Sequence, residues 1–212
     1  MSALVGRRME LEHGIAAVQQ RRGVVFHGEA GVGKTALLNH LVQRFRRGGR
    51  CVIELQTAEA TRSIPLWPFF QIFGQHPPAD WEQLLATAHE FLEHNDSNRP
   101  TVVAIDDANQ LDDASISLLR GLFHDSTWVV LATVRDDDDI PEQLEELWEL
   151  GIESHSIQPI AVNDNTALVS SLLGGPVTDS LAHAVLEVAR GNALVVGRKI
   201  AGLARYVPEE WY

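Results

Sequence analysis

The chain has 212 residues, of which 29 are acidic and 17 are Lys or Arg, and the resulting net charge of −12 at pH 7 argues against direct nucleic-acid binding by this segment. A single cysteine, Cys51, excludes an intramolecular disulfide and argues against a structural zinc site built from Cys and His. The sequence contains neither a run of 18 apolar residues nor a signal peptide, which predicts a cytoplasmic protein with no membrane partner.

Helical spacings and apolar runs alternate between residues 9 and 160. The spacings predict helices over 9–20, 35–47, 80–94, 113–123 and 141–150. The apolar runs predict strands over 23–27, 51–57, 101–106, 128–134 and 154–160. This alternation, with strands that lack polar interruptions, is typical of a parallel sheet covered by helices on both faces. We therefore expect an α/β fold with ligands at the carboxyl ends of the strands.

Between the first strand and the helix that follows it, residues 28–35 read Gly-Glu-Ala-Gly-Val-Gly-Lys-Thr, the phosphate-loop pattern of Gly, four residues and Gly-Lys-Thr. The glycines allow backbone N–H groups to turn toward a di- or triphosphate, and the helix N-terminus favours the same anion. Lys34 is suited to contact the β- and γ-phosphates, and the Thr35 hydroxyl to bind Mg²⁺. The predicted nucleotide-binding residues of this segment are Gly28, Glu29, Ala30, Gly31, Val32, Gly33, Lys34, Thr35 and Ala36.

Two acids, Asp106 and Asp107, end the apolar strand Val-Val-Ala-Ile that precedes them. A carboxylate at a strand end can hold Mg²⁺, directly or through water, and a second one can orient or deprotonate an attacking water. We assign Asp106 to the metal and Asp107 to the water. The alternative is a pair of acids that opens a surface turn.

The next strand ends in Thr133 and Arg135, which we expect at the same edge of the sheet. Thr133 is suited to hydrogen-bond the attacking water or the γ-phosphate. Arg135 has two interpretations: it pairs with the γ-phosphate and so distinguishes ATP from ADP, or it pairs with the acids Asp136 to Asp139 that follow it. ATP is favoured over GTP because the Asn-Lys-x-Asp guanine-binding motif is absent.

The pattern changes after residue 160. Three segments, 163–173, 179–190 and 194–205, have helical character, and Gly174-Gly175-Pro176 separates the first from the second. We therefore expect two domains, a P-loop nucleotide-binding domain over 1–160 and a helical lid over 161–212. The lid lacks a convincing terminal cap and is expected to be truncated.

Five motifs occur in a familiar order: Leu-Val-Gly-Arg-Arg at 4–8, the phosphate loop, Val-Val-Ala-Ile-Asp-Asp-Ala-Asn-Gln-Leu-Asp-Asp-Ala-Ser at 102–115, Leu-Ala-Thr-Val-Arg-Asp at 131–136, and Gly-Asn-Ala-Leu at 191–194. The chain resembles the N-terminal module of STAND-type signalling ATPases, within the AAA+-related P-loop class. Within this group it resembles the large LuxR-type bacterial transcriptional regulators related to the maltose regulator. The resemblance covers roughly residues 3–205.

This resemblance implies a P-loop NTPase three-layer sandwich with sheet order 5-1-4-3-2 and a C-terminal helical lid. It also implies that Val5, Gly6 and Arg7 line the adenine pocket and that Thr133 and Arg135 sense the phosphates. Proteins of this group are switches: ADP holds a closed form, and inducer with ATP opens it for self-association. A DNA-binding helix-turn-helix, absent from this segment, lies downstream in such regulators.

The sequence departs from the family pattern at two places. Gly191-Asn192-Ala193-Leu194 replaces the usual Gly-Asn-Pro-Leu near the lid, and Asn109-Gln110 replaces the usual His-Trp after the two acids. The first change puts the lid's contact with the nucleotide in doubt, and the second does the same for any role of that turn.

We therefore expect an ATP/ADP-binding switch module with slow Mg²⁺-dependent ATP hydrolysis, which controls a signalling or transcription-regulatory protein and self-associates with nucleotide. Asp107, Thr133 and Arg135 are the predicted catalytic residues, and Thr35 and Asp106 the predicted metal ligands. Two alternatives stay open. One is a non-hydrolysing, nucleotide-dependent scaffold. The other is an AAA+ loader or remodelling ATPase, which requires ring assembly and a lid arginine such as Arg190 or Arg198.

Overall fold

The computed structural model describes residues 4–74, 76–93, 99–123 and 128–160, together with residue 180 and the short stretches 166–170, 175–178, 182–185 and 195–196. The strands are β1 (Gly23–Gly28), β2 (Val52–Leu55), β3 (Thr101–Ile105), β4 (Trp128–Arg135) and β5 (Ile152–Ser156). The longer helices are α1 (Arg8–Gln19), α2 (Lys34–Arg47), α4 (Trp81–Glu93), α5 (Asp113–Leu122) and α6 (Glu142–Glu149). Shorter helical segments are η1 (Glu59–Thr61), η2 (Trp67–Phe69), α3 (Phe70–Phe73) and η3 (Ala108–Gln110).

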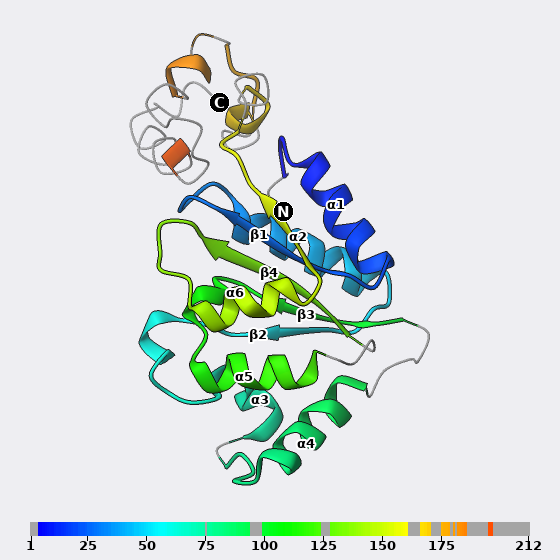
Figure 1. Cartoon of the computed structure of the whole chain (residues 1–212). Coiled ribbons are helices and arrows are strands. Elements are labelled where there is room, and N and C mark those ends of the chain that lie inside the picture. The colour runs from blue at the N-terminus through cyan, green and yellow to red at the C-terminus, as the bar shows by residue number, and fades with distance from the viewer. Residues whose placement is uncertain are drawn as a thin grey trace.

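The five strands form one parallel sheet in the order β2-β3-β4-β1-β5, which confirms the predicted order 5-1-4-3-2 read from the opposite edge (Figure 1). In the register of the sheet, Phe26 of β1 lies beside Thr133 of β4, and Ile105 of β3 lies beside Ala132 of the same strand. The carboxyl ends of β1, β3 and β4 therefore meet at one edge. The phosphate loop, the two acids and the end of β4 are all placed there.

Helices cover both faces of this sheet, as the alternation of strands and helices predicts. Val24 and Phe26 of β1 pack with side chains of α1 and α2, whereas Val25 between them belongs to a second cluster with α4, α5 and α6. Successive side chains of a strand point to opposite faces, so a strand that is apolar throughout requires a helix layer on each side. The result is the three-layer α/β sandwich that the resemblance implies.

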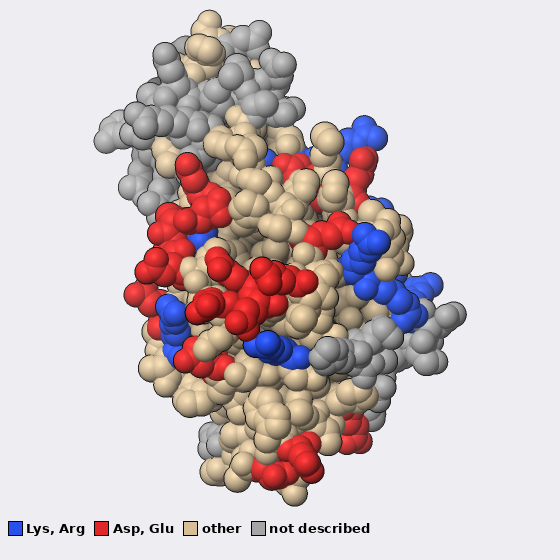
Figure 2. Space-filling model, viewed as in Figure 1, with Lys and Arg blue, Asp and Glu red and all other residues tan. Residues whose placement is uncertain are grey.

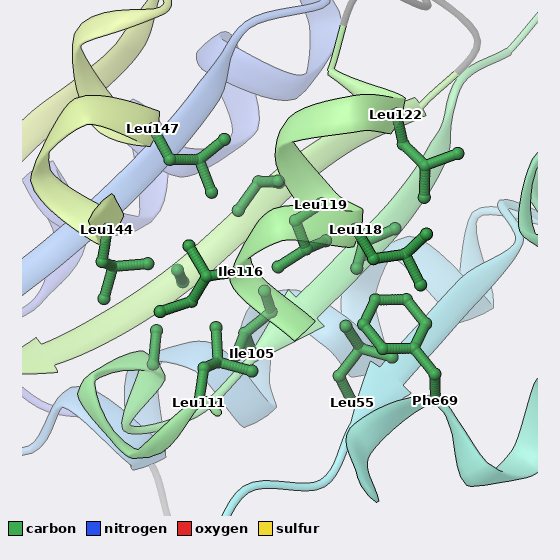
Figure 3. Packing of buried hydrophobic residues seen from close by; sticks show 14 of the residues in the cluster. Leu55, Phe69, Ile105, Leu111, Ile116, Leu118, Leu119, Leu122, Leu144 and Leu147 are labelled. Carbon is green, nitrogen blue, oxygen red and sulfur yellow. The ribbon is translucent and has the colours of Figure 1, made fainter. Parts of the chain in front are cut away.

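The core under α5 shows how densely the second face is packed. In Figure 3, Leu118 of α5 points toward Phe69 of η2 and Leu55 of β2, and all three are buried. Burial of one large aliphatic or aromatic side chain contributes about 1.5–3 kcal/mol to folding. This packing holds α5, and with it the turn that follows β3, against the sheet.

Several boundaries differ from those predicted. Strand β5 begins at Ile152, before the predicted 154–160, because Gly151 with φ of +117° makes the turn after α6 and releases the chain into pairing with Gly23. The predicted strand 51–57 is shorter in the structure, where β2 ends at Leu55. The chain leaves the sheet there because the Thr57 hydroxyl donates to the carbonyl oxygens of Asp106 and Asp107, just after β3. No element was predicted over 59–73, which folds into η1, η2 and α3.

Beyond residue 160, stretches 166–170 and 182–185 are helical and fall within the predicted helices 163–173 and 179–190. A small apolar cluster there joins Ile160, Leu168, Val169, Val185 and Val196. The division at residue 160 into a nucleotide-binding domain and a lid stays a prediction. No helix in the described part of the chain is long and apolar enough to cross a membrane.

Candidate nucleotide site

The phosphate loop connects the end of β1 to the start of α2, as its sequence context predicts. Gly31 and Gly33 have φ of +79° and +109°, a region that side chains with a Cβ rarely adopt. Gly33 caps α2 without any side-chain hydrogen bond, so backbone N–H groups of the first helical turn stay available to an anion. A Cβ on Gly28 would lie 2.7 Å from the carbonyl oxygen of Ile157, which explains the glycine at the start of the loop.

Lys34 lies inside this loop with only 4% of its surface exposed. Its Nζ donates to the carbonyl oxygens of Gly28 at 2.7 Å and Glu29 at 2.9 Å, and these two hydrogen bonds use two of the three ammonium protons. Burial lowers the pKa of Lys34, and the nearby carboxylate of Asp107 partly opposes this effect. A phosphate oxygen that accepts a hydrogen bond from the third proton would stabilise the charged amine and so offset the cost of its burial.

A hydroxyl–carboxylate cluster joins Thr35, Asp106 and Thr133. Asp106 Oδ1 accepts hydrogen bonds from Thr35 Oγ1 at 3.1 Å and from Thr133 Oγ1 at 2.6 Å. Thr133 is fully buried, and its Oγ1 also accepts a bond from the backbone N–H of Asp107 at 2.8 Å. The structure therefore brings together the predicted metal ligands Thr35 and Asp106 and connects them to Thr133.

The oxygen atoms of Thr35 and Asp106 are hard donors of the type that Mg²⁺ prefers. Among the residues that the structure describes, no group of three or more His, Cys, Asp or Glu side chains is arranged to hold a metal. Mg²⁺ bound between one hydroxyl and one carboxylate would take its remaining ligands from phosphate oxygens and water. This is how the ion usually binds in nucleotide sites.

Asp107 occupies an unusual backbone conformation at the end of β3, with φ of +46°. The Thr57 hydroxyl donates to the carbonyl oxygens of Asp106 and Asp107, which stabilises this turn. The Asp107 carboxylate pairs with Arg135, whose Nη2 lies 2.5 Å from Oδ2. Neither interpretation of Arg135 from the sequence named this partner; Asp137 and Asp138 act on Arg135 only as weaker, longer-range charges.

Lys34, Thr35, Asp107 and Arg135 line one cavity of about 630 Å³, whereas Asp106 and Thr133 are not among its lining residues. Asn39 also lines it and was missed by the sequence analysis, although it lies one helical turn after Thr35 on the same face of α2. The spacing of four residues between Thr35 and Asn39 on one helix is the sequence signal that predicts this position. The cavity is lined by Ala30, Gly31, Gly33, Lys34, Thr35, Ala36, Asn39, Asp107 and Arg135.

The predicted adenine-pocket residues are not among those that line this cavity. Val5 packs against the apolar cluster of the segments beyond residue 160, and Gly6 has φ of +69°. Arg7 is buried, and its guanidinium donates to the carbonyl oxygen of Val32 at 2.8 Å and to Glu10 at 2.9 Å. Arg7 thus ties the start of α1 to the phosphate loop, and a contact of these residues with adenine stays a prediction.

The two departures from the family pattern have different outcomes. Asn109 and Gln110 both donate to Asp138 Oδ2, at 2.8 and 3.3 Å, so this turn anchors the acidic loop after β4. Residues 191–194 lie outside the described residues, as do Arg190 and Arg198.

Residues 3–131, more than half of the chain, match the AAA ATPase domain family. None of the curated proteins compared with the chain matches it. Similar solved structures include a variant of RuvB from Thermotoga maritima (14% identity, TM-score 0.64), covering 95% of this chain and 63% of that one. AMPPCP-bound DnaA from Aquifex aeolicus has 15% identity and a TM-score of 0.64 over 94% of this chain and 62% of that one. The ADP complex of S. cerevisiae Hsp104 has 20% identity and a TM-score of 0.66 over 96% and 32%.

At these identities the solved structures establish a shared fold, and the chain spans about 63% of the RuvB chain. The family match rests on the sequence itself and includes the phosphate loop, Asp106 and Asp107. With the fold and the geometry of the cavity, it shows that this chain belongs to the AAA ATPase domain family and carries an AAA+ P-loop ATPase domain.

Proposed function

We propose that the chain is an ATP/ADP-binding switch module that hydrolyses ATP slowly with Mg²⁺ and controls a signalling or transcription-regulatory protein. The observation that carries the proposal is that Lys34, Thr35 and Asp107 line one cavity, while the Thr35 hydroxyl is hydrogen-bonded to Asp106. Support also comes from two proteins of similar structure, DnaA bound to AMPPCP and Hsp104 in complex with ADP.

Each residue has a role that follows from its contacts. Lys34 and the N–H groups of the phosphate loop bind the β- and γ-phosphates, where a positive charge and helix dipole act together. Thr35 and Asp106 would hold Mg²⁺, which screens phosphate charge when bound. Thr133 fixes Asp106 through its hydrogen bond, and Asp107 accepts a proton from, or orients, the water that attacks the γ-phosphate.

Slow hydrolysis is expected because the cationic residues that line the described cavity are Lys34 and Arg135, and Arg135 is paired with Asp107. A fast enzyme of this type needs a further arginine near the γ-phosphate, which a neighbouring subunit can supply. Nucleotide-dependent self-association is therefore part of the proposal. A cytoplasmic location is also proposed.

Direct binding of nucleic acid or of a membrane by this segment is not part of the proposed function. Acidic side chains gather over α6 and the loop before it (Figure 2). Exposed acids there include Asp136, Asp137, Asp139, Glu142 and Glu145. Such a face repels phosphate backbones and anionic lipid head groups.

The proposal is tested by steady-state ATP hydrolysis with Mg²⁺. Asp107→Asn keeps the shape of the side chain and removes the proton acceptor, so we expect turnover to fall at least about 100-fold, as for loss of a general base, while nucleotide still binds. Turnover by Asp107→Asn equal to that of the wild type would contradict the role of this acid. Binding without turnover by the wild type would instead favour the non-hydrolysing scaffold.

A loader or remodelling ATPase is a second candidate, because the neighbours of the same fold include the RuvB Holliday junction branch migration motor. Size-exclusion chromatography with Mg²⁺ and AMPPCP distinguishes this function from the switch. A ring that forms without any inducer favours the loader or remodeller, whereas a monomer favours the closed switch.

A further inference from the structure

Positive charge gathers at the edge of the sheet opposite the nucleotide cavity. Arg21, Arg50 and Arg99 each stand two residues before the first residue of a strand, β1, β2 and β3 respectively. Because the strands are parallel, their amino ends share one edge, and α2 returns to that edge from the phosphate loop. In Figure 2, which has the view of Figure 1, Lys and Arg side chains lie together at the right, where α1 ends. We call this surface the arginine edge; its members are Arg21, Arg22, Arg44, Arg46, Arg47, Arg50 and Arg99.

Carboxylates of the sheet balance only part of this charge. The ion pairs are Arg22 with Glu153 at 2.9 Å and Arg46 with Glu54 at 2.6 Å. In the part of the chain that the structure describes, Arg44, Arg50 and Arg99 pair with no carboxylate. Arg44 lies in the last turn of α2, where the helix dipole favours a cation. Arg99 donates to the carbonyl oxygen of Gly48 at 2.9 Å, which uses one of its several N–H donors.

Arg50 is held in place although its position is unfavourable for a cation. Its half-buried guanidinium lies over the ring of Phe45, 5.9 Å from the centroid. Its Nη1 is buried and finds no hydrogen-bond acceptor among the described residues. Burial lowers the pKa of Arg50, and the positive charges of Arg99 and Arg21 lower it further. Carboxylates placed at this edge would relieve the repulsion and offer acceptors to the guanidinium groups.

The arrangement suits an extended acidic ligand better than a small anion. A cavity of about 390 Å³ lies beside the last turns of α2, and Arg50 and Arg99 are not among its lining residues. The carbonyl end of the helix also disfavours an isolated anion there. Arg50 and Arg99 precede neighbouring strands, which lie about 4.8 Å apart in a sheet. An extended peptide with several acidic side chains could pair with both of these arginines and with Arg44.

The charge of the whole chain favours a short ligand. The net charge is −12, so a long nucleic-acid duplex that reaches beyond the arginine edge meets an acidic surface. Charges more than about 8–10 Å apart are largely screened in physiological salt. A short acidic segment on the arginine edge therefore responds mainly to the arginines around it.

We propose that the arginine edge is a docking surface for a short acidic polypeptide segment of a partner protein, whose Asp and Glu side chains form ion pairs with Arg44, Arg50 and Arg99. A guanidinium binds a carboxylate through two parallel N–H donors, which a surface rich in arginine provides repeatedly. The surface lies away from the nucleotide cavity, so the inference goes beyond the proposed function and does not depend on it.

Fluorescence anisotropy without nucleotide tests the proposal. The probe is a fluorescein-labelled peptide of six Glu-Gly repeats, and a peptide of six Gln-Gly repeats is its neutral match. We expect the wild type in 50 mM NaCl to bind the acidic peptide saturably, less tightly as salt is added, and not to bind the neutral one. Lys34→Ala, which alters the nucleotide cavity, should bind the acidic peptide as the wild type does.

The double variant Arg44→Gln/Arg99→Gln removes two exposed charges and should raise Kd by about fivefold or more, as for the loss of two exposed ion pairs. Arg50→Gln, with folding verified by circular dichroism, should also raise Kd. The matched control is Arg8→Gln/Arg62→Gln, which makes the same charge change at exposed positions outside the arginine edge and should change Kd less than about twofold. Equal effects of the two double variants, or a folded wild type that does not bind the acidic peptide, would overturn the inference.

Three further measurements identify a different occupant, and each positive result would also overturn the inference. Inorganic phosphate that displaces the peptide where NaCl of equal ionic strength does not would indicate a small-anion site. Tighter binding of a labelled single-stranded thymidine 20-mer, lost in Arg44→Gln/Arg99→Gln, would indicate a nucleic-acid surface. Self-association of the wild type that this variant abolishes, measured by sedimentation velocity without peptide, would indicate a second copy of the chain.

Discussion

At the scale of single residues, Thr133 connects the two acids of the site. Its hydroxyl donates to Asp106 Oδ1 and accepts the backbone N–H of Asp107, and the side chain is fully buried. A hydrogen bond from Thr133 to the attacking water or the γ-phosphate stays a prediction. The contacts in the structure add a role in placing the carboxylates.

Thr133→Val tests this role, because valine has the same shape and lacks the hydroxyl. We expect the free energy of unfolding to fall by about 1–3 kcal/mol, since the N–H of Asp107 loses its partner and the bond to a carboxylate is lost. Urea denaturation measures the change. Thr133→Ser keeps the hydroxyl and should retain most of the stability; equal losses in both variants would show that the methyl group matters and not the hydrogen bonds.

At the same scale, the sequence predicted which residues surround the cavity better than how they pair. A motif specifies Lys34, Thr35 and Asp106 through spacing and strand ends; Lys34 and Thr35 do line the cavity, and Thr35 is hydrogen-bonded to Asp106. The partner of Arg135 could not be predicted, because Asp107 is 28 positions away and its orientation depends on a backbone with φ of +46°. Positive φ at a non-glycine residue leaves no clear sequence signal.

At the scale of elements, α1 is attached to the phosphate loop through Arg7. The residue lies at the N-cap of α1, is buried, and donates to Val32 of the loop and Glu10 of the helix. The neighbouring Arg8 is fully exposed to solvent and pairs with Glu12 one turn later. Two adjacent arginines thus occupy opposite environments.

Arg7→Ala should therefore lower the free energy of unfolding by about 1–3 kcal/mol, because a buried carbonyl and a carboxylate lose a charged donor. Arg8→Ala is the matched control and should leave stability unchanged, since exposed i, i+4 ion pairs contribute little. Urea denaturation of both variants measures the difference. Equal effects of the two substitutions would contradict the anchoring role of Arg7.

A second contact joins α1 to the sheet edge. The rings of His13 in α1 and His155 in β5 are stacked with centroids 4.4 Å apart. Burial lowers the pKa of His155 below its usual value of 6.5, and the charges of His13 and His27 lower it further, while Glu10 and Glu153 oppose the shift. The folded state therefore favours the neutral ring.

The sign of the pH effect follows from this shift. Because the unfolded chain binds the proton more readily, His155 contributes stability above pH 6.5, and that contribution is lost as the pH falls from there through the folded-state pKa. We expect thermal stability to decrease from pH 7.5 to pH 5.5 and His155→Gln to show a smaller decrease. If the pH dependence of thermal stability in this variant equals that of the wild type, His155 does not cause the loss of stability at low pH.

At the scale of the whole molecule, the sequence predicted the sheet and its order because the relevant signals are regular. Continuous apolar strands separated by amphipathic helices indicate a parallel sheet with two covered faces, and the family resemblance supplied the strand order. The segment 59–73 could not be predicted, because its short helical turns depend on Phe69 reaching the core and on Asp112 accepting the N–H of Leu66. Such contacts are tertiary and have no periodic pattern.

The central claim is that this AAA+ domain binds ATP and ADP in the cavity around Lys34, and equilibrium binding tests it most directly. Mg²⁺–ADP and Mg²⁺–AMPPCP are titrated into the wild type and into Lys34→Ala, with folding verified by circular dichroism. We predict saturable one-to-one binding to the wild type and at least about tenfold weaker binding to Lys34→Ala, since the variant loses the charged contact to the phosphates. A folded wild type that binds neither nucleotide at millimolar concentration, or a Lys34→Ala protein that binds as tightly as the wild type, would contradict the claim.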